Sequence, residues 1–367
     1  MKIEKLSLLN FRNYACEEID FGENTNIILG NNAQGKTNIL EAIFLFSHGR
    51  SHRTKSDTEM IKFGSDFMKL ALEFCDSNRR YKAVLQLSKN GKKSITINNV
   101  PITKLSMLMR YLNVVMFSPE DLQIIKGAPL VRRHFLDEAI SQLYPIYLKR
   151  LISYHKNLAQ KNNLLKKMRF SQSSNDGMLD VWNEQLADDG AFIMKYRADF
   201  TEKLNSFSAD IHKEICGEIL NLLYTPSIDC DIIDKDNFYK KLLSVTEREI
   251  ENGSSLYGIQ RDEIRFFIGD KEIKNYASQG QQRTAVLSLK MAQTELIRDI
   301  RGEYPVLLLD DIMSELDSAR RAYLAGKISD KQVILTCTDA ESASVGKTSA
   351  VYKVENGGIE NVSASRK

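Results

Sequence analysis

At 367 residues, the chain has room for two or three domains, and its formal net charge of +3 is too small to indicate the charge of a partner. Five scattered cysteines without a CxxC pair favour a reducing compartment, and the histidines lack the spacing of metal ligands. Because no apolar run approaches the ~20 residues of a membrane span, we expect a cytoplasmic protein without a membrane partner.

Residues 1 to about 105 contain several short runs in which polar and apolar positions alternate, a pattern typical of strands. Asn90 and Gly91 separate two such runs, and this dipeptide predicts a hairpin with a two-residue turn. The apolar residues 27–29 are typical of a buried strand, and the apolar spacing after residue 38 is that of a helix. This part of the chain is therefore predicted to be β-rich with one inserted helix.

Residues 30–38, GNNAQGKTN, lie between that strand and that helix and have the spacing of a phosphate-binding loop. Glycines let backbone N–H groups turn toward a triphosphate, and the dipole of the following helix favours the same anion. Lys36 adds an ammonium for binding and catalysis, and Thr37 can place its hydroxyl on Mg²⁺. The alternative is a chance match, which the flanking strand and helix disfavour. The candidate ATP-binding residues are Gly30, Asn31, Asn32, Ala33, Gln34, Gly35, Lys36, Thr37 and Asn38.

The middle of the chain has helical apolar spacing from about residue 108 to 224, with one polar break at residues 171–177. Strand-like runs return nearer the C-terminus. We therefore expect an α/β lobe formed by residues 1–107 and 256–367, with residues 108–255 inserted as a mainly helical lobe.

A run of cations without any acidic residue lies between Glu138 and Asp176. On a helix, such a run suits contact with the phosphate backbone of DNA. The alternative is a solvated helix face, or a contact with an acidic surface elsewhere in the protein. No sequence-reading motif accompanies the run, so DNA binding should depend weakly on sequence. The candidate residues are Lys149, Arg150, Lys156, Lys161, Lys166 and Lys167, followed by Arg169.

A second anion-binding helix start is predicted at Ser278, Gln279 and Gly280, which precede a long amphipathic helix. The alternative is that Ser278 only caps that helix. Such a cap explains the serine, but it does not explain why a carboxylate pair follows so closely.

That pair ends the run VLLLDD, residues 306–311, which predicts a buried parallel strand. Ligands bind at the carboxyl edge of such sheets, so Asp310 is the candidate Mg²⁺ ligand and Asp311 the candidate catalytic base. The alternative is that Asp310 merely ends a strand and Asp311 caps a helix.

Taken together, the phosphate loop, the SQGQ block, the strand ending in two aspartates and the SELD block at residues 314–317 resemble an ABC-type ATPase head of the SMC kind. The order of the blocks resembles the RecF family of bacterial recombination and repair proteins, over essentially the whole chain. The blocks are LLNFRNY (8–14), GNNAQGKTNILEAI (30–43), GRSHRT (49–54), FSPEDL (117–122), RRHFLD (132–137), SQGQQR (278–283) and LLLDDIMSELD (307–317). The family's GPHRDD block is replaced by GIQRDE at residues 258–263, which puts in doubt any role of an imidazole at Gln260.

The resemblance implies an α/β fold: a phosphate-loop sheet with helices, an antiparallel β-subdomain and an inserted helical lobe. It implies that ATP and Mg²⁺ bind between two copies, with Ser278, Gln279 and Gly280 of one copy facing the loop of the other. ATP would then hold a homodimer together. Arg12 and Asn13 match positions that reach the phosphates, and Arg50 and Arg53 match a basic loop near the nucleotide. The alternative for each of these two arginines is an ordinary solvated side chain. Thr338 matches the switch position, and the glutamine-loop position falls among Ser118, Glu120 and Asp121.

The resemblance also implies ATP-dependent binding to single-stranded and duplex DNA at gap junctions, in recombinational repair, replication restart and the damage response. It implies slow, DNA-stimulated ATP hydrolysis and work with RecR and RecO to load RecA. Alternatives are an ATPase subunit of another DNA or transport complex, a small-molecule kinase, and a scaffold that binds ATP without hydrolysing it.

Overall fold

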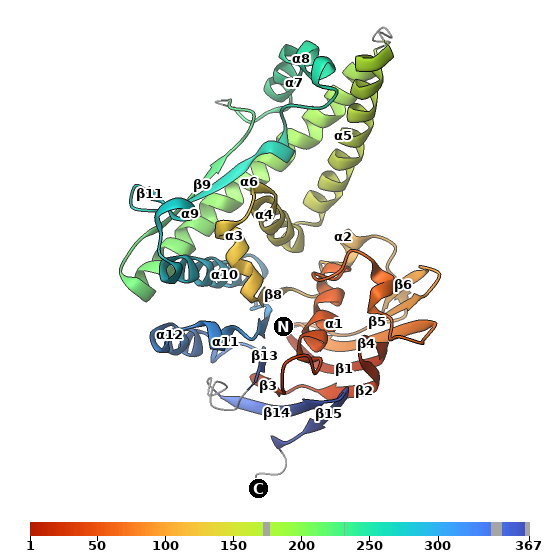
Figure 1. Cartoon of the computed structure of the whole chain (residues 1–367), viewed down its shortest axis with the longest axis vertical. Helices are drawn as coiled ribbons and strands as arrows, with labels where there is room; N and C mark the ends of the chain where they lie inside the picture. The colour runs from red at the N-terminus through yellow and green to blue at the C-terminus, as the bar shows by residue number, and fades with distance from the viewer. Residues whose placement is uncertain (172–176, 231, 339–346, 364–367) are drawn as a thin grey trace. The chain divides into compact units, whose positions relative to one another are not determined.

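The computed structural model describes residues 1–171, 177–230, 232–338 and 347–363, and the chain forms two compact units (Figure 1). Unit 1 comprises Met1–Asp121 and Leu287–Lys367, and unit 2 comprises Leu122–Val286. The expected boundaries were different, since residues 108–121 were assigned to the helical lobe and residues 256–286 to the α/β lobe.

Strand pairing explains why the unit boundaries differ from the expected ones. Strand β8 (Val114–Phe117) pairs in parallel with β12 (Val306–Asp310), so it belongs to the unit of the phosphate loop. Strand β10 (Glu263–Ile268) pairs with β9 (Leu220–Thr225), so it belongs to unit 2. Each pairing joins segments far apart in sequence, and apolar spacing alone does not reveal such partners.

One sheet of unit 1 is antiparallel, with strand order β2-β1-β4-β5-β6-β7. Its strands alternate buried and more exposed residues, as in β4, where Leu70, Leu72 and Phe74 are buried. The strands are β1 (Lys2–Phe11), β2 (Tyr14–Asp20), β4 (Phe67–Cys75), β5 (Arg80–Ser88), β6 (Lys93–Ile97) and β7 (Val100–Pro101).

The predicted hairpin joins β5 to β6, but its turn is one residue longer than expected. Ser88 N donates to Lys92 O at 3.0 Å, and Gly91 N donates to Ser88 O at 2.8 Å. Three residues therefore form the loop, and Gly91 at φ 81° takes the left-handed position that closes such turns.

The second sheet of unit 1 has the order β15-β14-β3-β13-β12-β8, and all its strands except β15 run parallel. The apolar residues 306–309 of β12 are fully buried, as expected for a strand covered on both faces. The remaining strands are β3 (Thr25–Leu29), β13 (Val333–Cys337), β14 (Thr348–Glu355) and β15 (Gly358–Asn361).

Helix α1 (Lys36–His48) follows β3, and its residues Ile39 and Ile43 are fully buried. They belong to one apolar cluster with Leu70 of the antiparallel sheet and Leu308 of the parallel sheet, so α1 and both sheets share a core. The other helical segments of this part are η1 (Asp57–Met60), α2 (Leu105–Leu108), η2 (Pro119–Leu122), α11 (Ile312–Glu315) and α12 (Ser318–Ile328).

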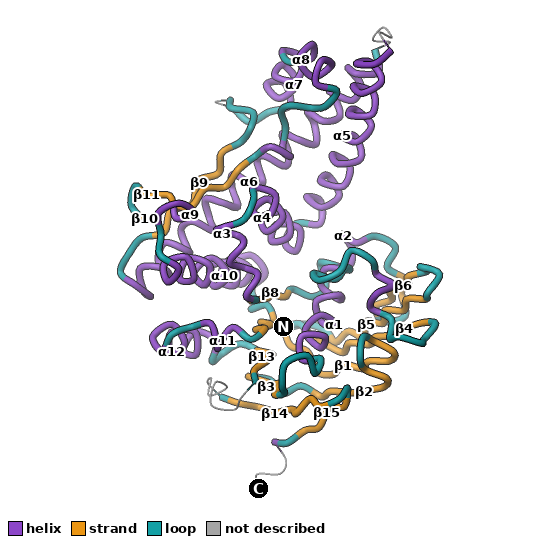
Figure 2. The backbone as a smooth tube through the Cα atoms, viewed as in Figure 1, coloured by secondary structure: helices purple, strands orange, loops and turns teal. Residues whose placement is uncertain are grey.

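Unit 2 is built around the long helices α5 (Pro145–Ser171) and α6 (Met178–Cys216), which pack against each other (Figure 2). Residues 172–176 of the predicted break lie outside the described residues. Strands β9, β10 and β11 (Lys271–Glu272) form a small antiparallel sheet. The other helical segments are α3 (Gln123–Lys126), α4 (Pro129–Leu143), α7 (Lys235–Ser244), α8 (Thr246–Asn252), η3 (Ile259–Arg261), α9 (Ile273–Tyr276) and α10 (Gln279–Arg301), which ends in unit 1.

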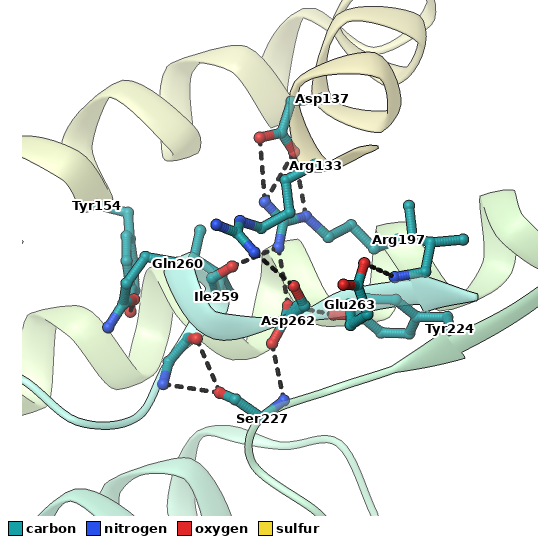
Figure 3. A network of polar contacts seen from close by, with 12 residues as sticks. Arg133, Asp137, Tyr154, Arg197, Tyr224, Ser227, Ile259, Gln260, Asp262 and Glu263 are labelled. Carbon is teal, nitrogen blue, oxygen red and sulfur yellow. Dashed lines mark hydrogen bonds and ion pairs between the residues drawn. The ribbon is translucent and has the colours of Figure 1, made fainter. Parts of the chain in front are cut away.

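A buried ion-pair network, which we call the Arg197 network, joins α4, α6, β9 and η3 (Figure 3). Arg197 donates to Asp262 Oδ2 at 2.8 Å, to Asp137 Oδ1 at 2.9 Å and to Ile259 O at 2.7 Å. Asp262 also accepts from the Tyr224 hydroxyl and from Ser227 N at 2.9 Å. Burial opposes the charge of Arg197, yet Asp137 and its other partners hold the pKa of the guanidinium well above its usual value.

Gln260, where the family pattern has His, lies at the side of this network (Figure 3). The Tyr154 hydroxyl donates to Gln260 Oε1 at 2.7 Å, and Gln260 Nε2 donates to Tyr257 O at 2.8 Å. Tyr154 is itself buried, and burial raises its pKa. In this chain the position thus holds a buried tyrosine by hydrogen bonds.

Candidate nucleotide-binding and signature sites

The predicted phosphate loop connects the end of β3 to the start of α1. Lys36 Nζ folds back over the loop and donates to Gly30 O at 2.6 Å and to Asn31 O at 3.0 Å. Gly35 has a φ of 111°, and a Cβ there would lie 2.5 Å from Asn13 Nδ2, so only glycine fits. The loop therefore keeps a compact turn around an ammonium group at the start of a 13-residue helix, which fits a phosphate ligand.

The turn between β1 and β2 holds this loop in place. Asn13 Nδ2 donates to Gln34 O at 2.8 Å, and the Tyr14 hydroxyl donates to Gly35 O at 2.9 Å. Asn38 Nδ2 donates to Asn13 Oδ1 at 2.8 Å. Asn13 was predicted as a nucleotide contact, and the structure shows that it fixes the loop backbone. The contact of Tyr14 was not predicted.

Arg12, also predicted to reach the phosphates, pairs with Glu41 of α1. Its Nε and Nη2 donate to the two carboxylate oxygens at 2.9 and 2.6 Å, and its Nη1 donates to Glu59 O. Burial opposes the charge of Glu41, but hydrogen bonds from Arg12 and Ser51 hold its pKa below the usual range. The geometry therefore gives Arg12 a protein partner for its charge.

The predicted basic loop lies close to the phosphate loop through Arg53. Its Nη1 donates to Asn38 Oδ1 at 2.7 Å, while Arg50 is exposed. A further cation that sequence reasoning missed is Lys62, whose ammonium donates to Asn13 O at 2.6 Å. Positive charge thus gathers around Asn13 and Asn38.

A hydroxyl and a carboxylate meet at the carboxyl edge of the parallel sheet. Thr37 Oγ1 donates to Asp310 Oδ1 at 3.0 Å, so the end of β12 lies beside the phosphate loop. Thr336 of β13 was missed, although its hydroxyl donates to the same oxygen at 2.7 Å and accepts from Asp311 N at 3.0 Å. Its signal was a single polar residue in the apolar run VILTC, opposite Asp310 in the strand register.

Oxygen donors of this kind fit Mg²⁺, which takes only one or two protein carboxylates and keeps several waters. Among the described residues, no group of three or more His, Cys, Asp or Glu side chains could enclose a metal ion. A site with one carboxylate and one hydroxyl is therefore compatible with magnesium brought in with phosphates.

Asp311 follows Asp310 and precedes α11. It has a φ of 51°, and its side chain does not cap that helix, contrary to the alternative considered from the sequence. Burial raises the pKa of Asp311, Lys36 lowers it and Asp310 raises it again, with a net increase. A carboxylate with a raised pKa is better suited to accept a proton near neutral pH.

Ser278 begins the predicted signature and caps α10. Its N donates to Gln281 Oε1 at 3.0 Å, and Gln281 N donates to Ser278 Oγ at 3.2 Å. This reciprocal pair is a capping box, so Ser278 does cap the helix. The Ser278 oxygen acts as an acceptor in this pair, and its hydroxyl hydrogen remains to donate to a ligand. Ser278, Gln279 and Gly280 belong to unit 2, and the phosphate loop belongs to unit 1.

The residues predicted for the glutamine-loop position and for the switch position lie in unit 1. Ser118 N donates to Asp121 Oδ2 at 2.8 Å, and Asp121 Oδ1 lies 3.3 Å from Lys290 Nζ. Glu120 is exposed, and Thr338 directly follows β13. Asp121 is thus the one of the three glutamine-loop candidates that holds an ion pair here.

The cations of α5 do not form one surface, and Lys161 was predicted wrongly. Its side chain is fully buried, and its ammonium lies 2.6 Å from the equally buried Glu249. Arg150 is paired with Asp188 and Asp189 at 2.5 and 2.8 Å. The exposed cations of the helix are Lys149, Lys156, Lys166, Lys167 and Arg169.

The family model described as RecF/RecN/SMC N terminal domain matches residues 2–360. The DNA replication and repair protein RecF of Lachnospira eligens is 41% identical over 98% of this chain and 99% of its own. The protein of the same name from Bacillus cereus (strain B4264) is 42% identical over 93% of each chain. None of the helices within the described residues is long and apolar enough to cross a membrane.

Solved structures agree with these relatives. A structure of the recombination mediator protein RecF-ATPrS in the RecFOR pathway is similar with a TM-score of 0.93 and 32% identity, over 99% of this chain and 98% of that one. The corresponding RecF-ATP structure has a TM-score of 0.92, 32% identity and coverage of 98% and 97%. An Smc head bound to the C-winged helix domain of ScpA has a TM-score of 0.58 at 18% identity, which concerns the fold alone. The predicted ABC-type head fold is confirmed.

Proposed function

Because the chain belongs to the RecF family of DNA replication and repair proteins, we propose that it is an ATP-dependent DNA-binding protein of recombinational repair and replication restart. The observation that carries the proposal is the contact of Thr37 and Thr336 with Asp310 beside the phosphate loop. It gives the chain a candidate Mg-ATP site of its own, and similarity to RecF-ATP structures supports ATP as the nucleotide.

ATP with Mg²⁺ supplies the phosphoryl group that is transferred to water. Lys36 binds the phosphates through the donor capacity of its ammonium, while Asn13 keeps the loop backbone in place. Thr37 and Asp310 would hold the Mg²⁺ ion, and Thr336 orients Asp310 by its hydrogen bond. Asp311 orients the attacking water and accepts its proton, helped by a raised pKa.

ATP binding also controls association with a second copy of the chain. The hydroxyl of Ser278, with the helix start at Gln279 and Gly280, donates to the nucleotide held by the partner. Hydrogen bonds to charged groups contribute roughly 1.5–3 kcal/mol each. A symmetric dimer has two such sites, so loss of their contacts after hydrolysis changes dimer affinity by several powers of ten, at about 1.4 kcal/mol for each tenfold change.

DNA contact is assigned to the exposed cations of α5, which are Lys149, Lys156, Lys166, Lys167 and Arg169. Such contacts reach phosphates rather than bases, so they accept single-stranded and duplex DNA and weaken steeply with salt. The proposed substrate is DNA at gap junctions, where ATP hydrolysis is slow and is stimulated by DNA. The protein would act in the cytoplasm with RecR and RecO to load RecA. These last features rest on family membership.

The central test measures dimerisation by sedimentation with ATP and with ADP, and DNA binding to duplex, single-stranded and gapped DNA with each nucleotide and with none. Lys36→Ala and Asp310→Ala should abolish ATP-dependent dimerisation, whereas Asp311→Asn should dimerise but hydrolyse ATP slowly. A dimer of equal strength with ATP and ADP would refute the gating mechanism. DNA affinity that does not change with salt would refute the backbone contacts.

A further inference from the structure

Gln281, the third residue of α10, connects the signature to a carboxylate outside it. Its Nε2 donates to Glu218 Oε1 at 3.3 Å and to Oε2 at 3.1 Å. Its Oε1 accepts from Ser278 N at 3.0 Å. Glu218 lies between the end of α6 and the start of β9, some sixty residues earlier in sequence.

The Glu218 carboxylate determines which way round the Gln281 amide lies. An ionised carboxylate only accepts hydrogen bonds, so the amide must present its NH₂ group to Glu218. The opposite end of the same amide then presents Oε1 to Ser278 N, as the capping box requires. Without Glu218, the amide could turn its NH₂ group toward the Ser278 N–H, and this hydrogen bond would be lost.

The backbone that carries Glu218 is fixed on both sides. Gly217 N donates to Lys213 O at 2.9 Å and ends α6, and the ring of the buried His212 donates from Nδ1 to Glu218 O at 2.9 Å. A cavity of about 800 Å³ lies beside Glu218 and Gln281, and Asp270 and Tyr276 also line it. The carboxylate is thus held in place while it keeps access to solvent.

We propose that Glu218 is a positioning residue for ATP-dependent dimerisation. It acts through Gln281 and keeps the Ser278 hydroxyl oriented toward the nucleotide of a second copy. This inference rests on the proposed function. A role limited to the stability of α10 is the competing explanation, and the test must separate the two.

The test measures the dissociation constant of the ATP-bound dimer for Glu218→Ala, Glu218→Gln, Gln281→Ala and the double alanine variant, with ATP saturation checked in each. Loss of the oriented hydrogen bond in both signatures should weaken the Glu218→Ala dimer at least about tenfold. Glu218→Gln keeps an acceptor for Gln281 and should restore affinity to within about threefold. The double variant should be no weaker than Gln281→Ala, because Glu218 acts through that residue.

Asp270→Ala is the matched control, because Asp270 lines the same cavity and the hydrogen bonds of the described residues do not join it to Gln281. It should dimerise as the unmodified chain does. Equal dimer affinity in Glu218→Ala and the unmodified chain would overturn the inference, as would additive losses in the double variant or no recovery in Glu218→Gln. If the unmodified chain fails to dimerise with ATP, the proposed function itself falls, and the inference with it.

Discussion

Replacing Asp262 by alanine should unfold unit 2 far more readily, because it removes the central acceptor of the Arg197 network. Asp262 is 1% exposed and accepts from Arg197 Nη1, the Tyr224 hydroxyl and Ser227 N. The variant leaves two neutral donors unpaired and removes one of the two carboxylates that balance a fully buried guanidinium. Breaking a buried ion pair in this way costs about 3–5 kcal/mol. We expect a loss of that size in the free energy of unfolding.

Urea unfolding followed by tryptophan fluorescence measures this loss in the relevant unit, because the only tryptophan, Trp182, lies on α6. The matched control is Glu272→Ala, which breaks the exposed pair with Arg265 in the same unit. Because solvent screens such an exposed pair, this variant should lose far less stability than Asp262→Ala. Asp262→Asn, which keeps an acceptor, should fall between the two. Equal losses in Asp262→Ala and Glu272→Ala would refute the claim that the buried acceptor Asp262 stabilises unit 2 more than an exposed ion pair does.

Three further predictions follow from single contacts. Asp311→Asn should stabilise the fold slightly at pH 8, because the pKa of Asp311 is raised in the folded state and its charged form then lowers the free energy of unfolding. The gain in melting temperature should shrink as the pH falls through the folded-state pKa of Asp311. A gain that does not change with pH would contradict this reasoning. Lys156→Ala should lower the slope of DNA affinity against salt concentration by about one charge. Lys161→Met should leave this slope unchanged, but it should lower the free energy of unfolding in urea by about 3–5 kcal/mol, because it leaves Glu249 buried without its partner. Gly190→Ala should cost about 1–3 kcal/mol in the same assay, because the new Cβ would lie 2.4 Å from the Phe238 ring, and an unchanged midpoint would contradict the packing.

The meeting of Thr37 and Asp310 could be predicted because it depends only on local pattern. Thr37 follows the apolar run of β3 and Asp310 ends the apolar run of β12, and parallel strands bring such ends to one edge of a sheet. Thr336 could not be predicted in the same way. A threonine is ordinary in a strand, and only the register with Asp310 shows that its hydroxyl supports the carboxylate.

The error at Lys161 has a different cause, since the information was present in the sequence. Along α5, the fully buried positions Tyr154, Lys161 and Leu165 recur with Leu158 at steps of three and four residues. Lys161 therefore lies on the apolar stripe of the helix, where a cation needs a buried partner. Counting cations along the chain ignored this periodicity. The partner, Glu249, lies on α8, so its identity still required the fold.

The Arg197 network also changes what the family resemblance means. Two of the blocks that carry it, residues 132–137 and 258–263, are more than a hundred positions apart, yet both supply acceptors to Arg197 (Figure 3). Their charges neutralise a cation that is buried inside unit 2, and they have no need of a nucleotide to do so. A match in these blocks is therefore an argument for the fold. ATP chemistry depends instead on Lys36, Thr37 and the carboxyl edge at Asp310, where the side chains have both the donors and the geometry to bind phosphate and metal.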